Sequence, residues 1–202
     1  MNSSKQEVWN VPNKLSMARL ILAFVVFGLI PFGFYWLAFW FFVIAAGTDW
    51  IDGWYARKYD QVTQLGRILD PFCDKILICG VFILLAVEMQ SGFPWYAKVA
   101  GWMAVVVTGR ELLVTVLRSL IEGRGGDFSA KMPGKLKMWF QCIAAGAALV
   151  ALAMQAKDPE TALPAWLVAT LVISIWAAII STLYSGYLYV AAGWEQIVSP
   201  SE

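Results

Sequence analysis

The chain has 202 residues, of which 60% are hydrophobic and only 14% are charged. Soluble domains carry roughly 25% charged residues, so this composition excludes an ordinary water-soluble protein. The net charge of +1 gives no sign of nucleic-acid binding, and the absence of histidine excludes imidazole as a base or metal ligand.

Apolar stretches of spanning length follow one another along the whole chain. A bilayer core about 30 Å thick requires about 20 apolar residues in each helical span. We expect spans over residues 15–34, 36–54, 68–89, 95–120, 136–154 and 164–190, separated by breaks that contain Gly or Pro. The sequence therefore predicts an all-α integral membrane fold of six transmembrane helices in a single domain, residues 1–202.

The lysines and arginines are distributed unequally between the two sides of this arrangement. With the N-terminus in the cytoplasm, 13 of the 15 lie on the cytoplasmic side or in the helix halves nearest it, and only Lys98 and Lys157 lie opposite. This asymmetry is the positive-inside pattern. It predicts a multi-pass protein of the cell inner (cytoplasmic) membrane with both ends in the cytoplasm.

Four carboxylates occupy positions where the cytoplasmic ends of the second and third spans are expected. Asp49 and Asp52 are three residues apart, and Asp70 and Asp74 are four apart, so each pair shares one helix face. Because the intervening turn is short, the two helices are expected to be antiparallel neighbours. All four carboxylates can then converge on one point that faces the cytoplasm.

Charge at this depth requires neutralisation. Each buried carboxylate costs roughly 3 kcal/mol on membrane-insertion scales, so the aspartates must be protonated or bound to cations. Carboxylates without His or Cys favour a hard cation such as Mg2+ or Mn2+. Four of them suit a site for two ions about 3.5–4 Å apart, as used for in-line displacement at phosphorus.

The residues between the aspartates are small or basic. Gly53, Ala56 and Gly66 leave room for a nucleotide to approach the backbone, and Arg57 offers a planar fork to a phosphate. The alternative is that the aspartates pair with basic neighbours and only cap the helices. That alternative does not account for four aspartates at this spacing.

The order Asp49-x-x-Asp52-Gly53-x-x-Ala56-Arg57, eight residues, Gly66-x-x-x-Asp70-x-x-x-Asp74 is similar to the motif of the CDP-alcohol phosphatidyltransferases. The resemblance implies a homodimeric membrane enzyme with an interfacial segment at its N-terminus. It implies that CDP-diacylglycerol donates a phosphatidyl group to a small alcohol. It further implies that all four aspartates bind the two metal ions and that Asp74 is also the general base.

The same resemblance assigns residues to the CDP part of the donor. Gly53, Arg57 and Thr63 match motif positions that contact it. Asn13 and Ser16, at the start of the first span, look like the nucleotide-contacting Asn and Thr of the family, with Ser replacing Thr.

A second group of basic residues lies downstream and points to the acceptor. Arg110 and Arg118 are eight residues apart on similar faces of the fourth span, and Lys135 and Lys137 open the fifth. A helix start with basic side chains is an anion site. Positive-inside snorkelling is the alternative, but Arg110 lies within an apolar helix beside Glu111. We therefore expect an acceptor that carries its own phosphate.

Residues 10–19, 69–75, 110–118 and 134–141 resemble the phosphatidylglycerophosphate synthase branch of the family. That resemblance implies sn-glycerol 3-phosphate as acceptor and phosphatidylglycerol phosphate and CMP as products; inositol phosphate or another alcohol is the alternative within the class. A cation-coupled transporter would need carboxylates near the bilayer midplane and often an inverted repeat, and the sequence has no internal repeat. A scaffold protein would leave the four aspartates unexplained.

Overall fold

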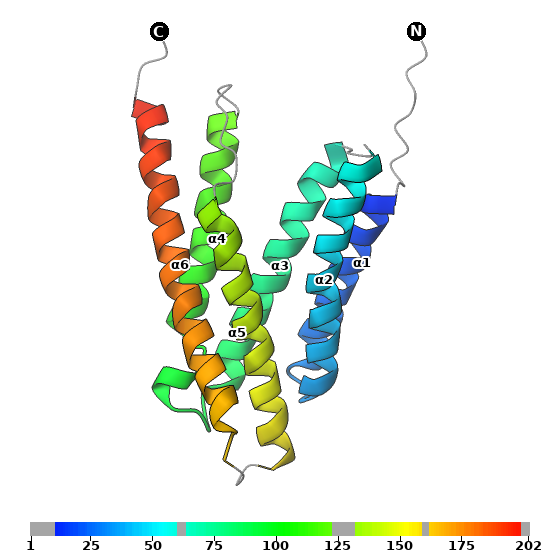
Figure 1. The fold of residues 1–202 in the computed structure, drawn as a ribbon, viewed down its shortest axis with the longest axis vertical. Coiled ribbons are helices and arrows are strands. Elements are labelled where there is room, and N and C mark those ends of the chain that lie inside the picture. The colour runs from blue at the N-terminus through cyan, green and yellow to red at the C-terminus, as the bar shows by residue number, and fades with distance from the viewer. Residues whose placement is uncertain (1–10, 60–63, 123–131, 159–161, 199–202) are drawn as a thin grey trace.

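The computed structural model describes residues 11–59, 64–122, 132–158 and 162–198, and the side chains of residues 14–48, 72–73, 75–121, 136–158 and 162–193. Every element in these ranges is a helix (Figure 1). The elements are α1 (Val11–Leu29), α2 (Tyr35–Tyr59), α3 (Gln64–Glu88), the 3-10 turn η1 (Trp95–Ala97), α4 (Gly101–Glu122), α5 (Met132–Lys157) and α6 (Ala165–Val198).

One long helix covers most of each predicted span, but the bounds differ. The fourth span was expected to begin at Trp95, whereas α4 begins at Gly101 because Pro94 and Lys98 have extended backbones on either side of η1. Helices α2, α3, α5 and α6 extend into polar sequence beyond the apolar stretches. Apolar composition marks only the part of a helix that faces lipid or core. The predicted N-terminal interfacial segment lies outside the described residues.

Glycine and proline set the breaks between helices. Gly33 and Gly92 have φ values of 78° and 82°, a left-handed conformation that a side chain disfavours. The Gly92 carbonyl also accepts a hydrogen bond of 2.9 Å from Gln155 Nε2, which ties the α3–η1 connection to α5. Pro12 and Pro133 lie in the first turns of α1 and α5, where a helix does not need the missing N–H.

The helices pack as two groups that share one core. Helices α1, α2 and α3 contact one another and form the first group. In the second group, α6 contacts both α4 and α5. The groups meet where α3 packs against α4 and α5 and where α2 packs against α5. The start of α1 and the end of α6 lie at the same end of the bundle, here called the terminal end, toward which the two groups diverge (Figure 1). The largest buried apolar side chains at the centre include Phe42, Phe82, Leu85, Met103, Leu149, Leu171 and Ile175.

The outer surface of the bundle is apolar as well. Among the described residues, two helices have the length and composition of a membrane span, Leu136–Lys157 and Ala165–Gly193. Many large apolar side chains on the outer helix faces are exposed, among them Phe24, Trp40, Val105, Ile173 and Ile180. A soluble monomer rarely exposes so much contiguous apolar surface. The structure therefore fits a membrane protein.

The contact between α1 and α3 depends on a glycine. A Cβ atom at Gly80 would overlap the ring of Phe27. Gly80→Ala is therefore expected to lower stability by about 1–3 kcal/mol through overpacking, measured as a fall in the thermal unfolding midpoint in detergent. Gly28→Ala is the matched control because no atom lies within 4 Å of a Cβ built there. Equal unfolding midpoints for the two variants would contradict this close approach.

Candidate active site

The acidic motif lies on two helices at the terminal end. Asp49 and Asp52 are in the second half of α2, Asp70 and Asp74 are in the first half of α3, and only residues 60–63 separate the helices. The helical backbone at all four positions agrees with the expected helical spacing, so each pair shares a helix face. The four side chains lie outside the described residues, and their convergence stays a prediction.

The residues expected at the nucleotide surround the same end. Gly53, Ala56 and Arg57 lie in the last turns of α2, Gly66 lies in the first turn of α3, and Asn13 lies in the first turn of α1. The side chains of these residues, like the whole of Thr63, lie outside the described part of the chain.

Ser16 is the predicted nucleotide contact whose side chain is described, and it is fully buried. Its carbonyl accepts a hydrogen bond of 3.4 Å from Cys73 Sγ on α3. Since Cys73 immediately precedes Asp74, this bond holds the start of α1 against the acidic motif.

The predicted acceptor residues Arg110 and Lys137 come together on one carboxylate. Lys137 on α5 and Arg110 on α4 both donate to Oε1 of Glu111, Arg110 through Nη1 at 3.2 Å. The Arg110 and Glu111 side chains are each only 10% exposed. Lys135 lies two residues before Lys137 on α5, and its side chain is outside the described residues. Residues two apart do not share a helix face, so Lys135 and Lys137 lie on different faces of α5.

Lys75 on α3 joins this group, which the sequence alone did not indicate. Its ammonium donates a hydrogen bond of 2.5 Å to Thr115 Oγ1 on α4, and Thr115 donates in turn to the Glu111 carbonyl at 2.6 Å. Lys75 lies close enough to Arg110 and Arg118 for their charges to act on it. We call Lys75, Arg110, Glu111, Arg118 and Lys137 the charge cluster. The sequence signal that could have identified Lys75 is its position directly after Asp74.

Helix α6 supports the charge cluster from a third side. The Arg110 guanidinium carbon lies 5.3 Å from the centre of the Tyr189 ring, a cation–π geometry. A Cβ atom at Gly186 would lie 3.2 Å from Arg110 Cγ, so glycine leaves space for the arginine stem. One turn further along, Gln141 Nε2 donates to Thr182 Oγ1 at 3.1 Å and joins α5 to α6. Arg110 is therefore held by Glu111 on α4 and by Tyr189 on α6.

The charge cluster has more hydrogen-bond donors than acceptors. Nε and Nη2 of Arg110 and Nε of Arg118 are buried and have no hydrogen-bond partner within the described part of the chain. Lys137 and Arg110 bond to Glu111, and Lys75 and Arg118 lie near them, so the described side chains of the cluster carry four positive charges and one negative charge. A buried unpaired donor is costly, and guanidinium N–H groups match the oxygens of a phosphate. The cluster is chemically suited to bind a phosphate group.

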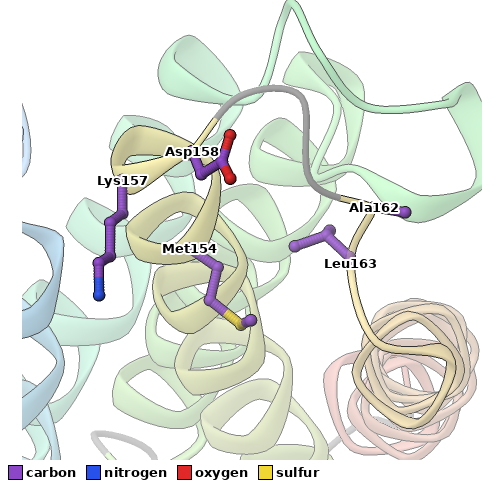
Figure 2. Close-up of a pocket in the computed structure, with 5 residues that line it drawn as sticks. All are labelled: Met154, Lys157, Asp158, Ala162 and Leu163. Carbon is purple, nitrogen blue, oxygen red and sulfur yellow. The ribbon is translucent and has the colours of Figure 1, made fainter.

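A small pocket elsewhere in the structure is not a candidate site. Met154, Lys157, Asp158, Ala162 and Leu163 line it, where α5 ends and the chain leads into α6 (Figure 2). The end of α5 and the start of α6 lie at the opposite end of the bundle from the terminal end (Figure 1). None of the residues expected in catalysis lines the pocket.

The donor set of the acidic motif fits a divalent metal ion. Among the described side chains, no group of three or more His, Cys, Asp or Glu residues could hold a metal. The motif supplies only carboxylates, from two adjoining helices, and hard cations such as Mg2+ and Mn2+ prefer such oxygen donors. If a divalent ion binds within this chain, the four aspartates are its expected ligands.

Comparison with known proteins agrees with this chemistry. The sequence pattern of the family described as CDP-alcohol phosphatidyltransferase matches residues 9–185. A Bacillus subtilis protein named CDP-diacylglycerol–glycerol-3-phosphate 3-phosphatidyltransferase is 33% identical to this chain, over 94% of this chain and 98% of its own length. Proteins of the same name from Blochmanniella floridana and Pseudomonas fluorescens are 31% and 29% identical, each over at least 90% of both chains.

Proposed function

Because the chain belongs to the CDP-alcohol phosphatidyltransferase family, we propose that it transfers the phosphatidyl group of CDP-diacylglycerol to sn-glycerol 3-phosphate. The products are phosphatidylglycerol phosphate and CMP. The observation that carries the choice of acceptor is the charge cluster, in which three buried arginine N–H groups have no partner among the described residues and the described side chains carry more positive than negative charge. The names of the similar proteins support the same pair of substrates.

The acidic motif is assigned to the chemical step. Asp49, Asp52, Asp70 and Asp74 would hold two divalent ions, Mg2+ or Mn2+, which supply electrostatic stabilisation of charge on the diphosphate. Asp74 accepts the proton of the acceptor hydroxyl as that oxygen bonds to the phosphorus bearing diacylglycerol. The bond from this phosphorus to the CMP oxygen breaks, and no covalent enzyme intermediate is required.

The nucleotide and the acceptor are assigned to different helices. Asn13, Ser16, Gly53, Ala56, Arg57, Thr63 and Gly66 are proposed to bind CDP-diacylglycerol. Arg110, Arg118, Lys135 and Lys137 are proposed to bind the acceptor phosphate. Helix α3 carries both Asp74 and Lys75, and Lys75 bonds to Thr115 on α4. The acceptor phosphate would therefore lie close to the proposed base, as attack on the donor requires.

We further propose that the enzyme is a homodimer with six membrane-spanning helices and that its active site faces the cytoplasm. The terminal end carries the acidic motif, the start of α1 and the end of α6 (Figure 1). Lys98 and Lys157, the two basic residues expected on the other side, lie just after η1 and at the end of α5, away from that end. This arrangement supports a terminal end in the cytoplasm.

An acceptor screen tests the proposed function. Purified protein with CDP-diacylglycerol and Mg2+ or Mn2+ is expected to release CMP when sn-glycerol 3-phosphate is added. Removal of the divalent metal with EDTA is expected to stop the release, and readdition to restore it. Glycerol, serine and inositol phosphate are the comparison acceptors. A much higher kcat/KM with any of these would contradict glycerol 3-phosphate as the substrate.

A further inference from the structure

Glu111 is the carboxylate of the charge cluster, and a negative group next to a phosphate site requires an explanation. Its side chain is buried, and its Oε1 accepts hydrogen bonds from both Lys137 and Arg110. An anion placed there repels a phosphate, so Glu111 does not favour binding by its own charge. Its contacts suggest instead that it acts through the two cations that it holds.

Without Glu111, repulsion between their like charges would favour separation of Lys137 and Arg110. Lys137 and Arg110 come from different helices and are close enough for their charges to repel each other. Repulsion between like charges is strong where water is largely excluded. A shared carboxylate oxygen cancels part of that repulsion and fixes the position of both side chains. It occupies Nη1 of Arg110, while Nε and Nη2 have no hydrogen-bond partner among the side chains and backbone that the structure describes.

We propose that Glu111 is a positioning residue for the acceptor site. It fixes Lys137 and Arg110 so that the remaining N–H groups of Arg110, together with Nε of Arg118, stay available for the acceptor phosphate. The inference rests on the proposed function, because it deepens the assignment of this cluster to the acceptor. The backbone carbonyl of the same residue binds Thr115, which holds Lys75, so one residue organises cations from three helices.

Glu111→Gln tests the role because it keeps the shape of the side chain and removes its charge. We expect KM for glycerol 3-phosphate to rise about tenfold or more, as for loss of one charge-assisted hydrogen bond. KM for CDP-diacylglycerol is expected to stay within about twofold. Glu88→Gln is the matched control: Glu88 accepts a 2.8 Å bond from Tyr35, outside the charge cluster. This control should leave both KM values unchanged.

A double-mutant cycle with Lys137→Met separates positioning from folding. If Glu111 acts through Lys137, Glu111→Gln should have a much smaller effect on the acceptor KM when Lys137 is already replaced. The same fold-change in both backgrounds, or an equal rise in both KM values, would contradict the proposal. Wild-type protein that releases no CMP with glycerol 3-phosphate would contradict the proposed function. Wild-type activity with an unchanged acceptor KM in Glu111→Gln would contradict the role of Glu111 alone.

Discussion

Asp74→Asn is expected to reduce kcat for CMP release by about 100- to 10,000-fold, the contribution typical of a positioned general base. Asparagine has nearly the same shape as aspartate, but its amide cannot take the proton of the acceptor hydroxyl. It also removes one negative charge from the proposed metal ligands. Three aspartates remain, so much of the nucleotide binding should persist.

The measurement for Asp74 combines turnover with nucleotide binding. Initial rates of CMP release give kcat. Nucleotide affinity is obtained for the wild type from inhibition by CMP and for the variant from direct binding of CMP, and the two affinities are compared. Asp158→Asn is the matched control, since Asp158 is exposed and directly follows α5, which ends away from the terminal end (Figures 1 and 2). Normal turnover in Asp74→Asn would exclude this residue as the base. Loss of nucleotide binding equal to the loss of turnover would assign it to the metal alone.

Arg110→Ala is expected to raise KM for the acceptor by about 10- to 100-fold, the range for lost hydrogen bonds to a charged group. KM for CDP-diacylglycerol should change much less. The structure gives two reasons for the size of the effect. The substitution removes two buried donors that have no partner in the described residues, and it leaves Glu111 with Lys137 as its described partner.

Arg110→Lys distinguishes charge from geometry at the same position. Lysine keeps the positive charge but lacks the planar fork that can bind two phosphate oxygens. It is therefore expected to restore only part of the acceptor affinity. Lys98→Ala is the control for loss of a basic residue, because Lys98 Nζ bonds only weakly, at 3.4 Å, to the Gln90 carbonyl. Equal increases in both KM values for Arg110→Ala would make Arg110 a structural residue.

The helices could be predicted from the sequence because apolar stretches of spanning length are a strong local signal. Their ends could not, since backbone conformation at Pro94 and Lys98 decides where α4 begins. The helical spacing within the acidic motif was also a local property, and the helical backbone of α2 and α3 agrees with it. Whether the four carboxylates meet depends on side chains outside the described residues, and it stays a prediction.

The contacts of the proposed acceptor site could be predicted only in part, because they join separate helices. Arg110 stood out in the sequence because it interrupts an apolar helix, and the structure brings it to Lys137. The contact of Lys75 with Thr115 spans 40 residues and depends on how α3 packs against α4. No residue spacing within one helix reports such a contact. In the sequence Glu111 was noticed only as a neighbour of Arg110, whereas the structure shows it as the common partner of Arg110 and Lys137.

The aromatic ring beneath Arg110 has a consequence for how related enzymes could diverge. Tyr189 lies four residues beyond the last position that the family pattern covers, residue 185. A substitution there would alter the support of the guanidinium while every signature residue stayed the same. If Arg110 binds the acceptor phosphate as proposed, a change at Tyr189 would alter that binding, and comparison of the family pattern alone would not detect it.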